Sequence, residues 1–279
     1  MTAPPRLSIV IVTFNSVPDI DRCLASLAAA PPATSHQIVV VDNASPDGTA
    51  AHVRQRWPRV TVLDAGGNTG FSHANNVGIR ATRGELILLL NPDTVVPAGA
   101  LDALIATLER HPGAAVAGPR LVDGLGRAEL SHGPMISPFA ELGQKLLVRA
   151  HARGSGLAAR VVERRTRRPA TVDWVSGACL LVRREAAERV GLLDERFFMY
   201  TEDVDFCARL RAAGYQVRFD PSSEVVHLRG RSAASAPSAT AAAYRRSHLQ
   251  FYARHHPRWV PVLRAYLKVR GQLPDSDEQ

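Results

Sequence analysis

Short apolar runs alternate with amphipathic segments over the first 120 residues of the chain. Runs of β-branched and aliphatic residues flanked by turn residues predict five strands, at residues 7–12, 37–41, 60–63, 86–90 and 114–117. The segments between them predict helices at 19–30, 49–57 and 98–111, each followed at once by proline. Strands and helices that alternate at this spacing predict parallel βαβ units around a buried sheet, and therefore an α/β fold.

The pattern changes after residue 118. Residues 119–172 are rich in Gly, Pro, Ser and Arg, which predicts a mobile, surface-exposed segment. Regular patterns then return, with a strand at 172–182, a helix near 184–190, a helix at 203–213 and two strands at 215–219 and 224–228. A Ser/Ala-rich linker at 230–240 leads to a basic, aromatic-rich helical tail over about 241–270.

The composition is that of a soluble globular chain, with 279 residues, 46% hydrophobic and 22% charged. No apolar run approaches the roughly 20 residues of a membrane span, and the apolar run near the N-terminus is too short for a secretory signal. The three cysteines, Cys23, Cys179 and Cys207, lack metal-ligand spacing and fit a reducing compartment. We therefore expect a cytoplasmic protein.

The net charge of +8 suggests an anionic partner, but the charge is unevenly distributed. Residues 145–168 carry eight basic side chains and one acidic, and residues 228–279 carry nine and three, so the rest of the chain has a balance of −5. No nucleic-acid-reading motif is present, and we expect no nucleic-acid partner. The basic segments fit a phospholipid surface or a pyrophosphate-linked acceptor, or they reflect a genomic preference for Arg.

Polar residues follow three of the predicted strands, where an open parallel sheet binds its ligands. The segments are 13–16, 42–49 and 91–93. Asp42 suits either an Asx turn or a carboxylate that accepts hydrogen bonds from a nucleoside. Asp93 suits either a turn or a bound cation, which would compensate a carboxylate beside a very apolar strand. The chain has neither a glycine-rich dinucleotide fingerprint nor a Walker lysine, which disfavours an NAD site or a P-loop.

Three further groups of residues have both a structural and a chemical interpretation. The loop 68–78 is dense in amides and glycine, which suits the binding of an anion or ribose, or close packing at Gly78. Glu202, Asp203 and Asp205 begin a predicted helix, either as complements to its dipole or as a carboxylate pair containing a general base. His227 ends the last predicted strand, as a core residue or a metal ligand.

Taken in order, these motifs resemble the family 2 glycosyltransferases of GT-A fold, and most closely the bacterial rhamnosyltransferase-like branch. The resemblance covers about residues 7–228 and rests on six motifs: Ser8-Ile9-Val10-Ile11-Val12-Thr13-Phe14-Asn15, Val41-Asp42-Asn43-Ala44-Ser45, Asn68-Thr69-Gly70-Phe71, Leu90-Asn91-Pro92-Asp93, Trp174-Val175-Ser176-Gly177 and Met199-Tyr200-Thr201-Glu202-Asp203-Val204-Asp205. It implies a mixed, mostly parallel sheet flanked by helices, with a C-terminal helical extension.

The resemblance also implies domain boundaries. Residues 1–228 would form the GT-A domain, with a nucleotide-binding half at 1–118, a mobile basic acceptor-side segment at 119–172 and an acceptor and catalytic half at 173–228. Residues 229–279 would be the linker and basic helical tail.

The resemblance assigns a role to each candidate site residue. Asp203 would be the catalytic base with Glu202 beside it, and Trp174 would line the acceptor or sugar site. Asp93 and His227 would bind a divalent cation. The donor nucleotide would be held by Thr13, Asn15, Asp42, Asn68, Gly70 and Asn91. Asn91 stands where many members of the family have aspartate, which keeps a carbonyl acceptor but loses a charge.

The implied activity is inverting, metal-dependent sugar transfer, with Mg²⁺ or Mn²⁺. The donor would be a dTDP- or UDP-sugar, with dTDP-rhamnose preferred, and the acceptor a hydroxyl of a cell-envelope glycan or a polyprenyl-pyrophosphate-linked sugar. The basic tail would either pack on the domain or touch the inner face of the plasma membrane. The alternatives are a nucleotidyltransferase acting on sugar phosphates and a non-catalytic nucleotide- or nucleic-acid-binding protein.

Overall fold

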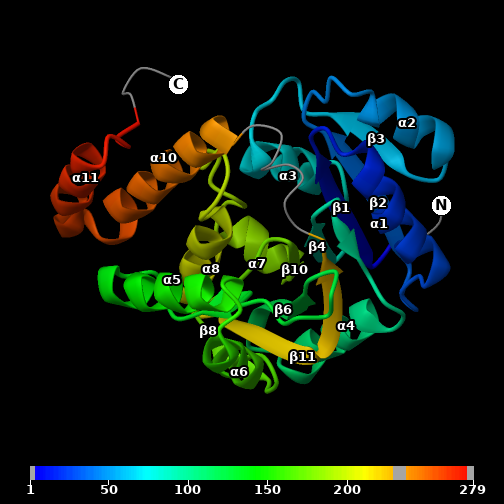
Figure 1. The fold of residues 1–279 in the computed structure, drawn as a ribbon. Coiled ribbons are helices and arrows are strands. Elements are labelled where there is room, and N and C mark those ends of the chain that lie inside the picture. The colour runs from blue at the N-terminus through cyan, green and yellow to red at the C-terminus, as the bar shows by residue number, and fades with distance from the viewer. Residues whose placement is uncertain (1–3, 229–236, 275–279) are drawn as a thin grey trace.

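A nine-stranded sheet forms the centre of the computed structural model, which describes residues 4–228 and 237–274 (Figure 1). The strand order is β3-β2-β1-β4-β10-β6-β11-β5, and β8 pairs with β11 outside this path. The strands are β1 (Leu7–Thr13), β2 (His36–Asp42), β3 (Thr61–Asp64), β4 (Leu86–Leu90), β5 (Thr94–Val95), β6 (Ala114–Val122), β8 (Ala170–Val172), β10 (Cys179–Arg183) and β11 (Gln216–His227). A small second sheet pairs β7 (His132–Gly133) with β9 (Trp174–Val175).

The strand directions match the expected sheet. Strand β1 pairs in parallel with β2 and β4, and β2 pairs in parallel with β3. Strand β10 is antiparallel to both β4 and β6, and β11 runs parallel to β6. Strands β5 and β8 are antiparallel to β11, so six of the nine strands share one direction. The prediction of a mixed, mostly parallel sheet is confirmed.

Helices cover both faces of the sheet because the apolar side chains alternate along the strands. Leu7, Ile9 and Ile11 of β1 pack with one set of helices, while Val10 and Val12 pack with the other. The first set comprises α1 (Val17–Ala29), α2 (Thr49–Arg56) and α4 (Ala100–Arg110). The second set comprises α3 (Phe71–Arg80), α7 (Arg184–Arg189), α8 (Glu202–Ala212) and α10 (Pro237–His255).

Most predicted elements of the first 118 residues are confirmed to within two residues, although β6 continues to Val122. The single strand predicted at 172–182 was wrong, since the chain forms β8, β9 and β10 there. The two strands predicted at 215–219 and 224–228 are one strand, β11, with an irregularity between Asp220 and Glu224.

Residues 119–172 are more regular than their composition predicts. They include two helices, α5 (Pro138–Ala152) and α6 (Gly156–Arg165). Ser137 and Ser155 cap these helices, with side chains that accept hydrogen bonds from the backbone N–H groups of Ala140 and Ala158. The expectation of an irregular segment was therefore wrong, while its mobility stays a prediction.

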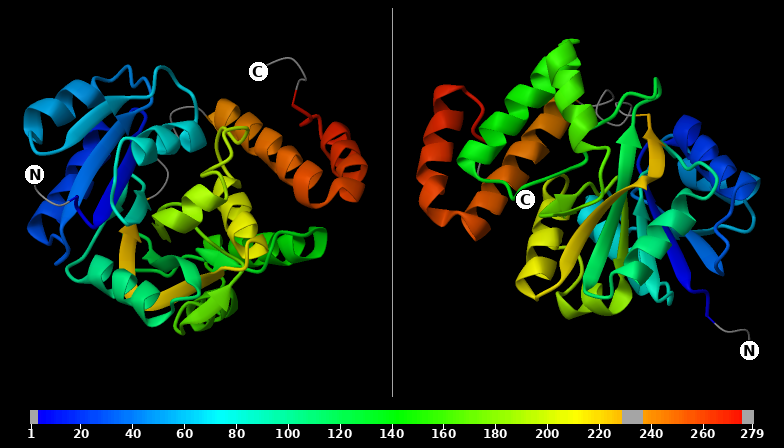
Figure 2. Two further views of the ribbon diagram at one scale, coloured as in Figure 1. Left: turned by 180° about the vertical axis from the view of Figure 1, so that it is seen from behind. Right: turned by 90° about the horizontal axis from the view of Figure 1, so that it is seen from below.

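The expected helical tail is confirmed. Helix α10 is followed by a short 3₁₀ turn (Pro257–Trp259) and α11 (Val260–Val269). Much of the predicted linker at 230–240 lies outside the described residues. The tail helices and α5 lie on the side of the molecule away from α1 and α2 (Figure 2). Within the described ranges, no helix is long and apolar enough to cross a membrane.

Candidate active site

The ends of β1 and β2 bring three of the predicted donor-binding residues together. Thr13 and Asp42 are register partners, and the Thr13 Oγ1 hydroxyl donates to Asp42 Oδ1 at 3.0 Å. The backbone N–H of Ser45, three residues later, donates to Asp42 Oδ2 at 3.0 Å, so this carboxylate holds the local turn. It does not cap the next helix, whose N-cap is Gly48. Asn15 has a positive φ of 53° and its backbone N–H donates to Ser45 Oγ. Within the part of the chain that the structure describes, its buried Oδ1 has no hydrogen-bond partner, and it is an acceptor that a ligand could use.

Asn68 and Gly70 lie beside this group. The side-chain amide of Asn43 donates to Asn68 Oδ1 at 3.0 Å, and Asn43 Oδ1 accepts from the backbone N–H of Thr69. Gly70 has a φ of 91°, and a Cβ there would lie 2.5 Å from the Phe198 carbonyl oxygen. Only glycine therefore allows the donor-side loop to approach the loop that precedes the predicted catalytic acids.

The end of β4 and the end of β11 place Asp93 beside His227. Asp93 Oδ1 lies 3.3 Å from His227 Nε2, and Glu129 Oε2 lies 3.4 Å from His227 Nδ1. Burial would lower the pKa of His227, but its hydrogen bonds to Asp93 and Glu129 raise the pKa to about 9. Each of the three side chains is largely buried.

A carboxylate and an imidazole side by side fit a divalent cation by their donor chemistry, and cation binding would require the neutral imidazole. Across the described parts of the chain, no group of three or more His, Cys, Asp or Glu side chains has the arrangement of a metal site by itself. The protein would therefore have to share the coordination of a cation with its ligand.

Asn91 links this side of the site to the next. Its backbone N–H donates to the carbonyl oxygen of Ala178 at 2.9 Å, and its own carbonyl oxygen accepts from Thr94 Oγ1. Ala178 follows Gly177, which contacts Asp203. The turn at 176–178 thus connects the Asp93 strand end with the predicted catalytic base.

Asp203 is held in place by two backbone donors. The N–H of Gly177 donates to Asp203 Oδ2 and the N–H of Val204 donates to Oδ1, both at 2.8 Å. Burial raises the pKa of Asp203, while these two N–H groups oppose the rise. Burial and the adjacent Asp203 charge raise the pKa of Glu202 well above its usual range, and no described residue forms a hydrogen bond with Glu202 Oε2. Glu202 therefore takes up a proton more readily than Asp203.

The backbone just before these acids has an uncommon conformation. Tyr200 and Thr201 both have positive φ, at 70° and 62°, which is costly for residues other than glycine. Helix α10 contacts this turn, since the Ser247 hydroxyl donates to the Met199 carbonyl oxygen at 2.7 Å and the Tyr244 ring meets the Tyr200 ring edge-on. The tail thus contacts the backbone that presents Glu202 and Asp203.

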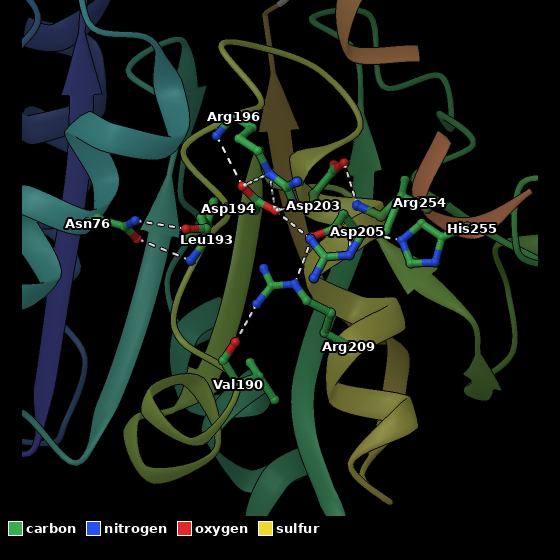
Figure 3. Close-up of polar contacts among 11 residues, drawn as sticks. Asn76, Val190, Leu193, Asp194, Arg196, Asp203, Asp205, Arg209, Arg254 and His255 are labelled. Carbon is green, nitrogen blue, oxygen red and sulfur yellow. Dashed lines mark hydrogen bonds and ion pairs between the residues drawn. The ribbon is translucent and has the colours of Figure 1, made fainter. Parts of the chain in front are cut away.

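Asp205 is a structural anchor. It is fully buried, and its carboxylate contacts Arg209 Nε at 2.7 Å and His255 Nε2 at 2.8 Å (Figure 3). Arg254 lies between Asp205 and Asp194 and pairs with both. The partners Arg254 and His255 come from α10, so Asp205 joins the predicted catalytic helix to the tail.

Trp174 lies in the core, 9% exposed, and its indole N–H donates to the Pro134 carbonyl oxygen at 2.9 Å. Contact of this ring with the sugar or the acceptor stays a prediction.

Gly78 packs closely against the sheet, which was one of its two interpretations. A Cβ at this position would lie 2.5 Å from a side-chain atom of Val10.

Two residues of the site were not predicted. Glu129 lies in a hairpin far from any motif, and only the fold brings it to His227. Asn43 belongs to a recognised motif, but nothing in the sequence indicated that its amide would fix Asn68.

The site combines strand-end polar residues, an aspartate–histidine pair and a buried acid pair. Comparison with known proteins identifies the family of the chain. The model of the family "Glycosyl transferase family 2" matches residues 8–191, and the chain belongs to this family. It is a glycosyltransferase, which favours sugar transfer over the nucleotidyltransferase and binding-protein alternatives.

Several relatives are rhamnosyltransferases. The chain is 35% identical to the N-acetylglucosaminyl-diphospho-decaprenol L-rhamnosyltransferase of Mycobacterium tuberculosis, over 97% of this chain and 95% of that protein. It is 26% identical to the rhamnosyltransferase WbbL of Escherichia coli, over 78% of this chain and 82% of that protein. The resemblance to the rhamnosyltransferase-like branch is confirmed.

A solved structure supports the fold. The mannosyltransferase PcManGT from Pyrobaculum calidifontis, in complex with GDP-Man and Mn²⁺, aligns with a TM-score of 0.61 at 21% identity, over 95% of this chain and 70% of that chain. The prediction of a GT-A fold is confirmed.

Proposed function

We propose that this enzyme transfers rhamnose from dTDP-rhamnose to a hydroxyl of a sugar linked through a diphosphate to a polyprenyl lipid, with inversion at the anomeric carbon. The reaction type is supported by the presence of two separate groups in the site, one suited to act as a base and one suited to bind a cation. One carboxylate, Asp203, is held by two backbone N–H groups, while Asp93 and His227 form a pair at neighbouring strand ends. The choice of sugar and acceptor is supported by the names of the relatives.

Asp203 is proposed to act as the general base. The acceptor hydroxyl would attack the anomeric carbon from the face opposite the leaving nucleotide and give its proton to an Asp203 oxygen. A single displacement needs no nucleophilic residue and inverts the anomeric centre. Glu202 holds its proton more readily, because it is buried beside a second carboxylate, and this arrangement favours Asp203 as the group that stays ionised.

Asp93 and His227 are proposed to hold a Mg²⁺ or Mn²⁺ ion together with the donor diphosphate. When bound, such a cation would neutralise the negative charge that develops on the departing nucleoside diphosphate. Asn91 would add a neutral carbonyl ligand or contact the donor directly. The mannosyltransferase from Pyrobaculum calidifontis, which was solved with both GDP-Man and Mn²⁺, supports this proposal.

Thr13, Asn15, Asp42, Asn68 and Gly70 are proposed to bind the nucleoside. Asp42 retains free lone pairs on both oxygens, which supports the proposal that it accepts a hydrogen bond from the pyrimidine N3–H. The unpartnered Asn15 Oδ1 would accept a second hydrogen bond. Trp174 is proposed to line the sugar or acceptor site.

The tail is proposed to rest on the inner face of the plasma membrane, where a polyprenyl acceptor is found. Trp259, Val262, Tyr266 and Val269 recur at helical spacing, and all four side chains are exposed. Arg258 and Arg270 flank this apolar stripe. A helix that is apolar on an exposed face and has basic residues beside it is typical of an interfacial helix.

The test is a transfer assay with purified protein, a GlcNAc-diphosphate-polyprenol acceptor and a panel of dTDP-, UDP- and GDP-sugars, each with Mg²⁺, Mn²⁺ or a chelator. We expect transfer from dTDP-rhamnose, release of dTDP rather than pyrophosphate, and loss of turnover with the chelator. Turnover with another nucleotide sugar alone would overturn the donor proposal. Release of pyrophosphate would overturn the reaction type.

A further inference from the structure

Helix α6 forms one wall of a cavity of about 600 Å³ that the proposed reaction does not use. Five arginines line it: Arg127, Arg160, Arg164, Arg167 and Arg168. Helix α6 lies at the lower edge of the molecule in Figure 1, away from α1 and α2. The high density of guanidinium groups indicates an anionic ligand.

The acidic groups near the cavity do not neutralise it. Glu163 is the one carboxylate in the lining, and it pairs with Arg120 at 2.8 Å and with Arg167 at 2.7 Å. Arg127 pairs with Asp123. Within residues 4–228 and 237–274, no ion pair is seen for Arg160, Arg164 or Arg168. Among the described residues, the buried Nδ1 of His151, another lining residue, has no hydrogen-bond partner. The cavity lining therefore carries an excess of positive charge.

Exposed leucines stand beside these arginines. Leu157 is 75% exposed and precedes Arg160 and Arg164 on α6 by three and seven residues, which places all three on one face of the helix. Leu125 is 78% exposed and lies two residues before Arg127. Free phosphate or a soluble polyanion gives no reason for exposed leucines, whereas a lipid phosphate does, because the leucines can enter the apolar boundary while guanidinium groups hold the headgroup.

We propose that this arginine cavity binds the phosphate or diphosphate group of a membrane lipid, with Leu125 and Leu157 entering the bilayer interface. This proposal depends on the proposed function in one respect, which is that a polyprenyl diphosphate is one of the candidate lipids. Two lipids offer this chemistry, the headgroup of an anionic phospholipid and the diphosphate of the polyprenyl acceptor.

The test measures binding of the full-length protein to three kinds of vesicle: phosphatidylcholine alone, phosphatidylcholine with phosphatidylglycerol, and phosphatidylcholine with a polyprenyl diphosphate. The test variant is Arg160→Ala/Arg164→Ala. The matched control is Arg54→Ala/Arg56→Ala, which removes two exposed arginines from α2 on the opposite side of the molecule. We expect the test variant to bind anionic vesicles about tenfold more weakly or worse, and the control to bind like wild type.

The outcomes separate the two lipid sources and the two proposals. Stronger binding to polyprenyl diphosphate than to phosphatidylglycerol at equal charge identifies the acceptor, and equal binding identifies the phospholipid headgroup. Equal losses in the test and control variants, or no binding of wild type to either anionic vesicle, overturn the proposal. Calorimetry with dTDP-rhamnose on the same protein variants tests the proposed function separately. Loss of donor binding would count against the proposed function, whereas loss of vesicle binding alone concerns the arginine cavity. A Leu125→Ser/Leu157→Ser variant should lower vesicle binding at high salt, where charge is screened.

Discussion

Asp203 is the single residue on which turnover is expected to depend most. Replacing it by asparagine keeps the shape of the side chain and an acceptor for one of the two N–H groups of Gly177 and Val204, which donate to different oxygens of Asp203. It removes the proposed base. We expect Asp203→Asn to lower kcat by about 10²- to 10⁴-fold, the usual contribution of a general base. Donor binding, measured by calorimetry with dTDP-rhamnose, should be unchanged.

Glu202→Gln is the matched control for that change, since it removes the neighbouring carboxyl without removing the proposed base. Glu202 binds its proton more readily, and its neutral amide replacement should therefore lower kcat much less. If Asp203→Asn kept turnover near that of wild type, or if Glu202→Gln were the more damaging change, the assignment of the base would be wrong.

Gly70 offers a second residue-level test, because its position is fixed by geometry. An alanine Cβ would lie 2.5 Å from the Phe198 carbonyl oxygen, at a φ of 91°. We expect Gly70→Ala to displace the 197–200 turn, to destabilise the fold by about 1–3 kcal/mol and to lower turnover. Thermal unfolding and steady-state kinetics measure the two effects.

Gly66→Ala is the control in the same loop. Gly66 has a φ of 82°, but no atom lies within 4 Å of the position of its Cβ. The Gly66→Ala variant therefore has the backbone strain of a positive φ but no steric clash of its Cβ. Equal effects of the two substitutions would show that the approach of Phe198 to Gly70 has no functional role.

At this scale the sequence predicted residues that lie at strand ends, because strand ends follow from local patterns. Thr13, Asp42 and Asp93 belong to this group. Glu129 could not be found in the same way, since it reaches His227 through a hairpin 98 residues earlier in the chain. Partners of that kind depend on the tertiary fold, and no local pattern marks them.

At the level of elements, the sequence predicted the regular βαβ part well and the middle of the chain poorly. Strand β4 is apolar at every position and bounded by turn residues, so its limits are clear. Helix α6 contains three arginines among its ten residues, and α5 has a glycine in its interior, and these residues obscure the apolar faces of the two helices. What stabilises α5 is a tertiary contact: Glu141 accepts hydrogen bonds from His248 and from the Tyr252 hydroxyl of α10.

The contact between α5 and α10 predicts a dependence of stability on pH. Burial would raise the pKa of Glu141, but His248 and Lys145 lower it to about 2 from an ordinary 4.5. A carboxylate with a depressed pKa in the folded state stabilises that state at pH values above 4.5, and this stabilisation is lost as the pH falls toward 2. Glu141→Gln should therefore lower the free energy of unfolding by about 2 kcal/mol near neutral pH.

The measurement is urea unfolding of wild type and Glu141→Gln over a series of pH values. The difference between the two proteins should shrink as the pH falls below about 4.5. The exposed Glu85, which pairs loosely with Arg6 at 3.6 Å, supplies the control Glu85→Gln, with little effect at any pH. A constant difference at all pH values would contradict the role of the Glu141 charge.

Considered as a whole, the molecule divides its charge between its parts. The body that holds Asp42, Asp93 and Asp203 is mildly acidic, and the excess of arginine lies in the 145–168 segment and the tail. The tail is also part of the core, because Phe251 and Tyr252 of α10 are buried in the cluster that includes α8 and the sheet. The tail is therefore expected both to complete the core and to contact the membrane, and truncation can separate these two roles.

A chain ending at residue 228 is expected to fail as an isolated catalytic domain. It would lack Phe251 and Tyr252, and each large buried side chain contributes about 3–5 kcal/mol, a large share of the 5–15 kcal/mol that stabilises a typical domain. It would also leave the fully buried Asp205 without His255 and Arg254. Because Asp205 lies two residues after Asp203, we expect this fragment to lose cooperative unfolding and turnover together.

A chain ending at residue 256 should behave differently, because it keeps α10 and every contact of that helix with Asp205, Met199 and Glu141. It loses the 3₁₀ turn with the exposed Trp259, and α11, whose Val262, Tyr266 and Val269 are exposed. We expect near-normal thermal unfolding and transfer to a water-soluble acceptor, with weaker binding to anionic vesicles and slower transfer to a polyprenyl-linked acceptor in them. If the 228-residue fragment matched the full chain in stability and turnover, α10 would be dispensable for the active site. If the 256-residue fragment bound vesicles as well as the full chain, α11 would have no part in membrane contact.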